Sequence, residues 1–276
     1  MSPAESRLRE VLAGIVPGGI ALAYSGGVDS SVLLAARARL RAECPFPLAA
    51  VMAESVFQPP EEIRAARERA ARLGVGLHTV RHDPLSDPAL RQNPPDRCYR
   101  CKRRIFAEIR AWAGANGLAA VADGTNADDV RSTRPGLRAL RELAVRSPLA
   151  EAGLTKAAVR ELAAELIPEA AAQPASPCLA TRFEYGAALS AERLRLVAEG
   201  ERIIRERLPE AADVRLRVHG GTGRIEVTPG LIPAVAAGGR MLAARLKELG
   251  FKRIVLDLEG FGSGSMERTE DGHGQT

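Results

Sequence analysis

The first half of the chain alternates short apolar runs with longer stretches whose apolar residues recur at helical spacing. Short apolar runs predict strands that are buried on both faces, and the stretches between them predict helices. This alternation predicts an α/β fold, a parallel sheet that carries helices on both faces. The predicted strands cover residues 20–24, 47–53, 76–80 and 119–122, and the predicted helices cover 32–40, 60–73 and 101–113.

The second half of the chain has a different pattern. Two of its helices open at Thr155 and Ser190, whose side-chain oxygens suit the capping of a first helical turn. Two runs of alternating polarity flank the glycine-rich segment 219–223, which predicts a β-hairpin. The predicted helices cover 155–167, 190–208 and 231–249, and the predicted strands cover 213–218, 224–227 and 253–258.

This change of pattern predicts two domains and a tail. A loop with two prolines, at residues 173–178, marks the boundary. We expect a larger α/β domain over residues 1–172 and a smaller α+β domain over residues 173–263. Residues 264–276 are rich in glycine, serine and charge, a composition that predicts a disordered tail.

Composition restricts the partners of the protein. The chain has 276 residues, a formal net charge of +5 and only 4% aromatic residues. Few aromatic side chains are available to stack on single-stranded bases. Much of the positive charge is arginine spread along predicted helices, which favours a solvated helix face over a nucleic-acid surface. We therefore expect no nucleic-acid partner and a solvated face for Arg64, Arg67, Arg69 and Arg72.

The N-terminal residues lack a basic segment followed by a continuous apolar run, and no stretch is long enough to span a bilayer. We expect a cytoplasmic location without membrane association. Thiols stay reduced in the cytoplasm, so the four cysteines are better interpreted as metal, redox or catalytic groups than as a disulfide framework.

The hexapeptide Ser25-Gly26-Gly27-Val28-Asp29-Ser30 lies between a predicted strand and a predicted helix. Its glycines let the backbone approach phosphate oxygens, and the following helix presents unpaired N–H groups to the same anion. The hydroxyls of Ser25 and Ser30 can add donors, and Asp29 can hold Mg²⁺ on the phosphates. The lysine of a Walker A motif is absent. The hexapeptide therefore predicts an ATP site of a different type.

The segment Asp123-Gly124-Thr125-Asn126-Ala127-Asp128-Asp129 follows the predicted strand at 119–122. Asn and Asp cap helices well, so a structural role is one interpretation. Ligands of parallel sheets bind at the carboxyl ends of the strands, and we therefore favour a nucleotide contact. The residues expected to make it are Gly124, Thr125, Asn126 and Asp128.

Three cysteines are candidates for metal binding. Cys98 and Cys101 form a CxxC motif among basic residues, and Cys178 lies in a proline-flanked loop. Zinc binding and a structural role are alternatives, but three thiolates are one short of a closed Cys₄ zinc site. Three thiolates suit a [4Fe–4S] cluster with one open iron. Cys44 follows a predicted helix and is interpreted as structural.

Taken together, these motifs resemble the LarE family of ATP-dependent sulfur transferases, which act in nickel-pincer nucleotide biosynthesis and belong to the N-type pyrophosphatase-loop (PP-loop) superfamily. The resemblance covers nearly the whole chain. Besides the phosphate loop and the Asp-Gly-Thr-Asn segment, it rests on Asn93–Lys102, Arg134-Pro135-Gly136, Ser147-Pro148-Leu149, Cys178–Arg182, Arg215–His219, Arg224–Val227 and Leu256–Gly260.

The resemblance implies a PP-loop fold (adenine nucleotide alpha hydrolase-like), with an ATP-binding domain over 1–172 and a substrate and sulfur-transfer domain over 173–263. It implies that a carboxylate of pyridinium-3,5-biscarboxylic acid mononucleotide is adenylated, with release of pyrophosphate. Sulfur then replaces AMP and gives a thiocarboxylate, a precursor of the cofactor of lactate racemase. ATP, Mg²⁺, an external sulfide donor and a homo-oligomer such as a hexamer are also implied.

The resemblance implies two possible sulfur sources. In members with a single cysteine, the residue that matches Cys178 gives up its sulfur and is left as dehydroalanine. Members with three cysteines resemble cluster enzymes, in which a [4Fe–4S] cluster delivers sulfide. Because this chain has Cys98, Cys101 and Cys178, we predict the cluster route and keep sacrificial use of Cys178 as the alternative.

Arginines of the second domain are candidates for substrate binding. Arg215 and Arg217 alternate on one face of a predicted strand, where two guanidinium groups suit a phosphate or a carboxylate. An exposed strand face with ordinary charges is the alternative. Arg182, close to Cys178, is a similar candidate.

Glu201 and Glu226 match acidic positions that resemble a metal site of the family. The chain departs from the family pattern at two places. No carboxylate occurs soon after Glu226, where a third acid is expected, and Gly262 stands where an arginine is usual.

Three other functions remain as alternatives. A PP-loop enzyme that thiolates a tRNA base can also use a CxxC motif and a cluster, but the chain has few aromatics and no concentrated basic arm. A ligase that uses ammonia leaves the cysteines without a role. A regulatory module would bind the nucleotide without chemistry.

Overall fold

The computed structural model describes residues 2–15, 18–40, 47–131, 135–174, 176–209 and 212–262. The chain forms two compact units: Met1–Pro84 with Asp96–Gln173, and Leu85–Pro95 with Pro174–Thr276. Cys44, Arg134 and the predicted tail lie outside the described residues. In the described ranges, none of the helices has the length and apolar character that crossing a bilayer requires.

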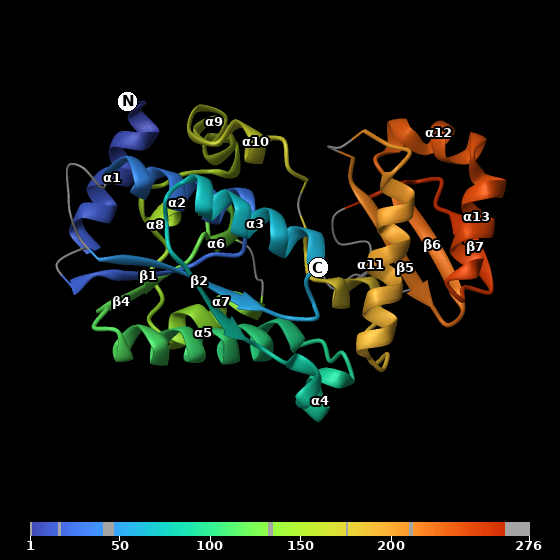
Figure 1. Cartoon of the computed structure of the whole chain (residues 1–276), viewed down its shortest axis with the longest axis horizontal. Helices are drawn as coiled ribbons and strands as arrows, with labels where there is room; N and C mark the ends of the chain where they lie inside the picture. The colour runs from blue at the N-terminus through green and yellow to red at the C-terminus, as the bar shows by residue number, and fades with distance from the viewer. Residues whose placement is uncertain are drawn as a thin grey trace. The chain divides into compact units, whose positions relative to one another are not determined.

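The first unit is built on a parallel sheet of β1 (Ile20–Ala23), β2 (Leu48–Glu54), β3 (Leu77–Arg81) and β4 (Ala120–Ala122), shown in Figure 1. The strand order is β3-β2-β1-β4, so β1 pairs with β2 on one side and with β4 on the other. The carboxyl end of β1 therefore lies at a topological switch point, which is the usual position of a ligand crevice in such sheets.

Helices cover both faces of this sheet because its strands are apolar on both faces. Ile20 and Leu22 face one core, whereas Ala21 and Val51 face the other. Figure 1 shows α1, α2 and α3 on the first face and α5 and α7 on the second. The helices of this unit are α1 (Pro3–Ile15), α2 (Val28–Leu40), α3 (Pro60–Arg72), α5 (Arg97–Ala115), α6 (Ala127–Val130), α7 (Pro135–Glu142), α8 (Pro148–Glu151), α9 (Lys156–Leu166) and α10 (Pro168–Ala171).

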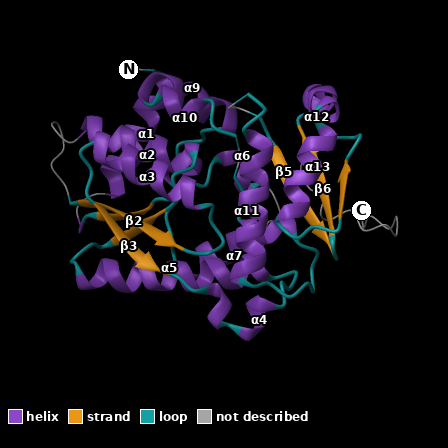
Figure 2. Cartoon of the chain, turned by 45° about the vertical axis from the view of Figure 1, so that its right-hand side comes forward, coloured by secondary structure: helices purple, strands orange, loops and turns teal. Residues whose placement is uncertain are grey.

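The second unit contains a separate sheet with the order β5-β6-β7. An antiparallel hairpin joins β5 (Val214–His219) to β6 (Thr222–Val227), and β7 (Arg253–Leu256) adds parallel to β6. The helix α11 (Ala191–Arg205) packs on β5, as Figure 2 shows. The other elements are α4 (Pro88–Arg91), η3 (Leu179–Arg182), η4 (Pro229–Leu231), α12 (Ile232–Ala237) and α13 (Gly239–Glu248), and η2 (Pro84–Ser86) lies where the first unit ends.

Asn93 anchors the segment 85–95 in the second unit. Its buried side chain donates to the carbonyl oxygens of Phe183 and Glu184 at 3.1 and 2.7 Å. Its own carbonyl oxygen accepts from the Gly186 nitrogen at 3.1 Å. The side chain and the backbone carbonyl of Asn93 therefore both bind this segment to the residues that follow η3.

The structure confirms the α/β fold, the predicted strands of the first half and the predicted hairpin. Thr155 and Ser190 cap α9 and α11 through their side-chain oxygens. Several details differ. The helices predicted at 32–40 and 101–113 begin earlier, at Val28 and Arg97, and the helix predicted at 231–249 is broken at Gly238. Helices α1 and α7 and the short helices α4, α6, α8 and α10 have no counterpart among the predicted elements.

Candidate functional site

The phosphate loop lies at the carboxyl end of β1 and leads directly into α2. The Ser31 nitrogen donates to the Gly27 carbonyl oxygen at 3.0 Å, which is the first hydrogen bond of the helix. The N–H groups of the preceding turn have no partner within the helix and lie at its positive end. The hydroxyls of Ser25 and Ser30 are 3.2 Å apart at the same turn. This arrangement of donors suits an anion such as phosphate.

Two glycines let neighbouring segments approach the loop closely. Gly26 has a φ of 81°, and a Cβ at this position would lie 2.4 Å from the Cβ of Ala66 on α3. A Cβ at Gly124, which follows β4, would lie 2.8 Å from the Ser30 nitrogen. Neither position accepts a side chain without a shift of its surroundings. The structure thus brings Gly124 against the phosphate loop.

Asp29 and Asn126 connect these two strand ends. Asn126 Nδ2 donates to Asp29 Oδ1 at 3.3 Å, while Asn126 Oδ1 accepts from the Asp128 and Asp129 nitrogens, each at 3.0 Å. Burial raises the pKa of Asp29, and the Asn126 hydrogen bond acts against that rise. A cation bound to this carboxylate would favour its ionised form. The position of Asp29 therefore suits a Mg²⁺ ligand.

Hydrogen bonds within the first unit involve three residues of the segment after β4: Asp123, Thr125 and Asp128. The Asp123 carboxylate accepts from the hydroxyls of Thr125 and Ser147. The Asp128 carboxylate accepts from the nitrogen of Lys156, the first residue of α9, at 2.8 Å. These bonds shape the segment that follows β4, and a direct contact of Thr125 or Asp128 with a nucleotide stays a prediction.

Arg69 belongs to this site, and the expectation of a solvated face is wrong for it. Arg69 is 5% exposed, and its Nη1 donates to the Gly26 carbonyl oxygen at 2.7 Å. Buried Ala66 and Ala70 share its side of α3, and this spacing is the sequence signal that identifies the buried face. The other three arginines have exposed side chains: 75% for Arg64, 49% for Arg67 and 57% for Arg72.

Cys98 and Cys101 lie one turn apart at the start of α5 in the first unit, and neither forms a disulfide. Arg97 Nη2 is 3.6 Å from Cys98 Sγ, and His82 Nε2 is 3.5 Å from Cys101 Sγ. Burial lowers the pKa of His82, whose Nδ1 is 3.7 Å from Glu108 Oε1. Polar contacts of this kind tune thiolates and iron-bound sulfur. The sequence analysis missed His82, which lies outside the CxxC segment.

Cys178 lies in the second unit, directly before η3. Its carbonyl oxygen accepts from the nitrogen and the hydroxyl of Thr181 at 3.0 and 2.8 Å, and Arg182 Nη1 donates to the Pro177 oxygen at 2.8 Å. These bonds fix the backbone on both sides of the cysteine. Among the described residues, no group of three or more His, Cys, Asp or Glu side chains is arranged for a metal ion. The cluster and its three cysteine ligands therefore stay a prediction.

Buried ion pairs connect η3, α11 and the hairpin of the second unit. Arg182 donates to both oxygens of Glu201 at 2.8 and 3.1 Å, and Arg205 adds a third bond at 3.1 Å. Arg217 Nε donates to Glu226 at 3.1 Å. Burial alone would raise the pKa of Glu201, but the guanidinium groups outweigh it and lower that pKa. A metal at Glu201 or Glu226 would have to displace these groups, so their role as metal ligands stays a prediction.

Arg215 lies in the same region and is also buried. Its Nη1 donates to the Val214 carbonyl oxygen at 2.8 Å, and its guanidinium carbon is 4.7 Å from the centre of the Phe261 ring. Burial and the charge of Arg182 lower the pKa of Arg215 to about 10. Because Arg215 and Arg217 are 1% and 5% exposed, the alternative of an exposed charged strand face is wrong.

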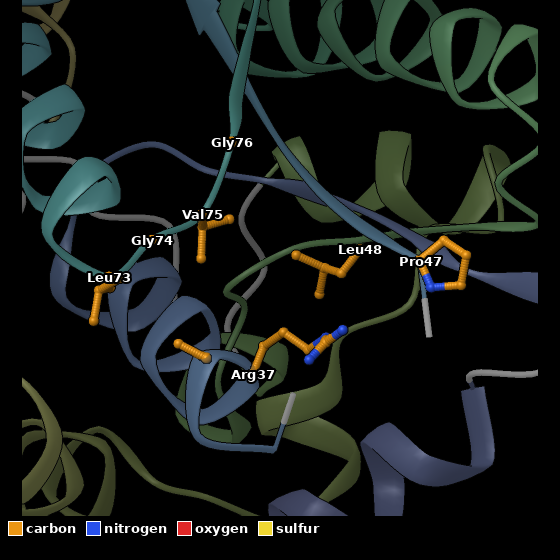
Figure 3. Close-up of a pocket in the computed structure, with 8 residues that line it drawn as sticks. Arg37, Pro47, Leu48, Leu73, Gly74, Val75 and Gly76 are labelled. Atoms are coloured by element: carbon orange, nitrogen blue, oxygen red, sulfur yellow. The ribbon is translucent and has the colours of Figure 1, made fainter. Parts of the chain in front are cut away.

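A cavity of about 280 Å³ lies at the other end of the parallel sheet. It is lined by the end of α2, the start of β2 and the turn between α3 and β3, with Arg37 and Leu48 among the side chains shown in Figure 3. The phosphate loop follows the carboxyl end of β1, whereas this cavity lies where β2 begins. The cavity is therefore separate from the predicted nucleotide site.

Comparison with known proteins gives no match to a protein-family model. The chain is 34% identical over 250 residues to the pyridinium-3,5-bisthiocarboxylic acid mononucleotide synthase of Lactiplantibacillus plantarum, which covers 91% of this chain and 89% of that protein. It is 34% identical over 249 residues to an uncharacterized protein of Synechocystis sp., covering 90% of this chain and 91% of that protein. An uncharacterized protein of Methanocaldococcus jannaschii is 30% identical over 243 residues, or 87% of this chain and 89% of that protein.

A parallel sheet with a Ser-Gly-Gly-Val-Asp-Ser loop at its switch point defines an α/β protein of the PP-loop class. The similarity to the synthase extends over nearly the full length of both proteins. The chain belongs to the LarE family.

Proposed function

We propose that this protein is an ATP-dependent sulfur transferase that acts on pyridinium-3,5-biscarboxylic acid mononucleotide. Its product is the thiocarboxylate precursor of the nickel-pincer cofactor of lactate racemase. The observation that carries the proposal is the similarity, over 91% of the chain, to a synthase named for pyridinium-3,5-bisthiocarboxylic acid mononucleotide. A cytoplasmic location, a homo-oligomer such as a hexamer and an external sulfide donor accompany this proposal as predictions.

Activation of the substrate takes place at the phosphate loop. The N–H groups at the start of α2, with Ser25 and Ser30, bind the phosphates of ATP, and Asp29 holds Mg²⁺. A carboxylate oxygen of the substrate attacks the α-phosphorus, and pyrophosphate leaves with the electron pair of the broken P–O bond. A sulfur nucleophile then attacks the acyl carbon, and AMP leaves with one former carboxylate oxygen. A second round on the other carboxylate gives the dithiolated product.

Arginines of the second unit bind the anionic substrate in this proposal. Its buried charged side chains include Arg182, Arg215 and Arg217, together with Glu201 and Glu226. Arg215 also lies 3.7 Å from the Asp213 carboxylate. Several guanidinium groups gathered in one region support binding of an anion, because a phosphate or a carboxylate accepts hydrogen bonds from such groups. The substrate carries both kinds of group.

Sulfur comes from a [4Fe–4S] cluster held by Cys98, Cys101 and Cys178 in this proposal, and such a cluster would supply sulfide from its open iron. The absence of a disulfide at these three cysteines, the Arg97 donor near Cys98 and the His82 ring nitrogen near Cys101 support this assignment. The alternative is that Cys178 itself gives up its sulfur.

The function is tested by incubating the protein with the biscarboxylate mononucleotide, ATP, Mg²⁺ and sulfide without oxygen. We expect AMP and pyrophosphate only when the substrate is present, and a product in which sulfur has replaced oxygen by mass. Formation of ADP and phosphate, or AMP release without conversion of the substrate, would contradict the proposal.

The sulfur source is tested by measuring iron and acid-labile sulfide on protein purified without oxygen. We expect about four irons and at least as many sulfides per chain. Alanine variants of Cys98, Cys101 or Cys178 should lose both, while Cys44→Ala, the matched control, should keep them. Iron-free protein that thiolates once and converts Cys178 to dehydroalanine would establish the sacrificial route instead.

A further inference from the structure

The side chain of Arg69 is tied to the backbone of the phosphate loop. Its Nη1 donates to the Gly26 carbonyl oxygen at 2.7 Å and to Ser31 Oγ at 3.2 Å. Its Nη2 donates to Oε1 of Gln173, the last residue of the first unit, at 3.3 Å. One guanidinium group therefore holds the loop, the first turn of α2 and the end of the unit.

The bond to Gly26 fixes the orientation of one peptide plane. In a trans peptide the C=O and the N–H point in opposite directions. The Gly26 carbonyl points toward Arg69, so the Gly27 N–H of the same plane points away from it. Glycines on both sides make this plane easy to rotate. The Gly27 nitrogen donates to Ser25 Oγ at 3.4 Å on the exposed side of the loop. Arg69 restricts rotation of the plane and so keeps the Gly27 N–H with the other donors at the start of α2.

The charge of Arg69 is a second, independent observation. All three hydrogen-bond acceptors of its guanidinium are neutral oxygens. Within the described part of the chain, no carboxylate forms an ion pair with Arg69, although the residue is 5% exposed. Glu169 is near enough to interact with the charge of Arg69 but forms its ion pair with Arg72. A buried guanidinium without a direct ion pair is costly, whereas a bound polyphosphate beside the loop would compensate it.

We infer that Arg69 is a positioning residue for the polyphosphate of ATP. It orients the Gly26–Gly27 peptide so that its N–H faces the phosphates that leave as pyrophosphate, and it supplies a positive charge behind the loop. This inference rests on the proposed function, in which the loop binds ATP.

The test compares two nucleotides and four proteins by calorimetry. The nucleotides are α,β-methylene-ATP, which is not cleaved between its α- and β-phosphates, and AMP, which lacks the phosphates that the loop binds. The proteins are the wild type, Arg69→Met, Arg69→Lys and the matched control Arg72→Gln. Arg72 lies one turn further along α3, where its exposed side chain pairs with Glu169.

We expect Arg69→Met to weaken α,β-methylene-ATP binding by about ten- to a hundredfold, the loss expected for one charged hydrogen-bonding group. AMP binding should change less than about twofold. Arg69→Lys keeps the positive charge but lacks the planar guanidinium with its several N–H donors, and we expect an intermediate loss of affinity for α,β-methylene-ATP. Arg72→Gln should bind both nucleotides as the wild type does. If Arg69→Met does not fold, the test rests on Arg69→Lys, which should bind α,β-methylene-ATP more weakly than the wild type and AMP equally well.

Other outcomes separate the inference from the proposed function. Equal losses for AMP and α,β-methylene-ATP, or no loss for either, would overturn the role of Arg69 while the ATP site stands. A wild-type protein that binds α,β-methylene-ATP no more tightly than AMP would overturn the proposed nucleotide site itself.

Discussion

Both units bury arginine side chains, but the guanidinium groups contact different partners. In the first unit, Arg69 donates only to neutral oxygens of Gly26, Ser31 and Gln173. In the second unit, Arg182 and Arg217 face the buried carboxylates of Glu201 and Glu226. The charges of the second unit are thus largely paired within the fold, whereas Arg69 has no direct ion pair among the described residues, and in our proposal the phosphates of ATP compensate its charge.

This difference separates a structural use of arginine from a binding use. A buried guanidinium paired with a buried carboxylate connects elements of the fold, here η3 with α11 and β5 with β6. Removal of either partner destabilises the protein, because the other charge is left buried and unpaired. A buried guanidinium with neutral partners destabilises the empty fold to some degree and becomes favourable when a phosphate binds. Variants in each unit should therefore affect different measurements, stability in the second and nucleotide binding in the first.

The largest effect is expected for Glu201→Gln. This change leaves Arg182 and Arg205 without their buried carboxylate, and the free energy of unfolding should fall by about 3–5 kcal/mol. Denaturant unfolding measures it. A loss below about 1 kcal/mol would mean that the buried pair contributes no more than a surface pair.

Acidification sharpens the same prediction. The pKa of Glu201 is lowered in the folded protein, so its stabilisation is complete above the ordinary value of 4.5 and is lost as the pH falls through the lowered pKa. The difference in unfolding free energy between the wild type and Glu201→Gln should therefore shrink below pH 4.5. A constant difference throughout acid titration would contradict the assignment of the lowered pKa to Glu201.

Asp29→Asn should act on catalysis without loss of stability. Removal of the carboxylate removes the proposed Mg²⁺ ligand, and we expect pyrophosphate release to fall by about a hundredfold or more, roughly 2.7 kcal/mol in the barrier. Burial raises the pKa of Asp29. The wild-type protein therefore loses unfolding free energy as the pH rises through that pKa and the carboxylate ionises. The Asn variant cannot ionise, so we expect it to be at least as stable as the wild type at pH 7. Near-normal release, or marked destabilisation, would contradict this role.

Gly26→Ala should reduce stability by about 1–3 kcal/mol, because the new Cβ meets Ala66 and the backbone has a positive φ. The matched control is Gly14→Ala in α1, where a Cβ meets nothing within 4 Å. This control should be neutral or stabilising by up to about 1 kcal/mol. Thermal unfolding of both variants measures the difference, and equal behaviour would show that α3 does not constrain the loop.

The smallest effect is expected for Glu199→Gln. Glu199 lies on α11 two residues before Glu201, but its side chain is 43% exposed and pairs with Arg202 at the surface. We expect a loss below about 1 kcal/mol. A loss as large as that of Glu201→Gln would mean that burial is not what distinguishes the two ion pairs.

The sequence predicts the first unit well because its signals are local. Apolar runs of strand length identify the sheet, and a parallel sheet brings the loop after β1 and the segment after β4 to one edge. Gly26 and Gly124 occupy positions that only glycine fits. The sequence places both glycines at predicted strand ends, while the close approaches that require them, to Ala66 and Ser30, are seen only in the structure.

Long-range contacts explain what the sequence leaves out. Its spacing from Ala66 and Ala70 places Arg69 on the buried face of α3, but its hydrogen bond to Gly26 depends on the packing of α3 against the loop. Arg217 alternates as an exposed strand residue would, but an acid on the paired strand lets it be buried. His82, which directly follows β3, lies beside Cys101 of α5 although the two residues are 19 apart in the chain. No periodicity records such pairs.

The central claim is that a carboxylate of the substrate is activated by transfer of AMP. The direct measurement uses biscarboxylate mononucleotide labelled with ¹⁸O in its carboxyl groups, ATP, Mg²⁺ and a sulfur source, with mass analysis of the AMP formed. The account predicts one ¹⁸O atom in the phosphate of each AMP, because the oxygen displaced by sulfur leaves with AMP. Unlabelled AMP, or label found in inorganic phosphate with ADP as the product, would contradict it.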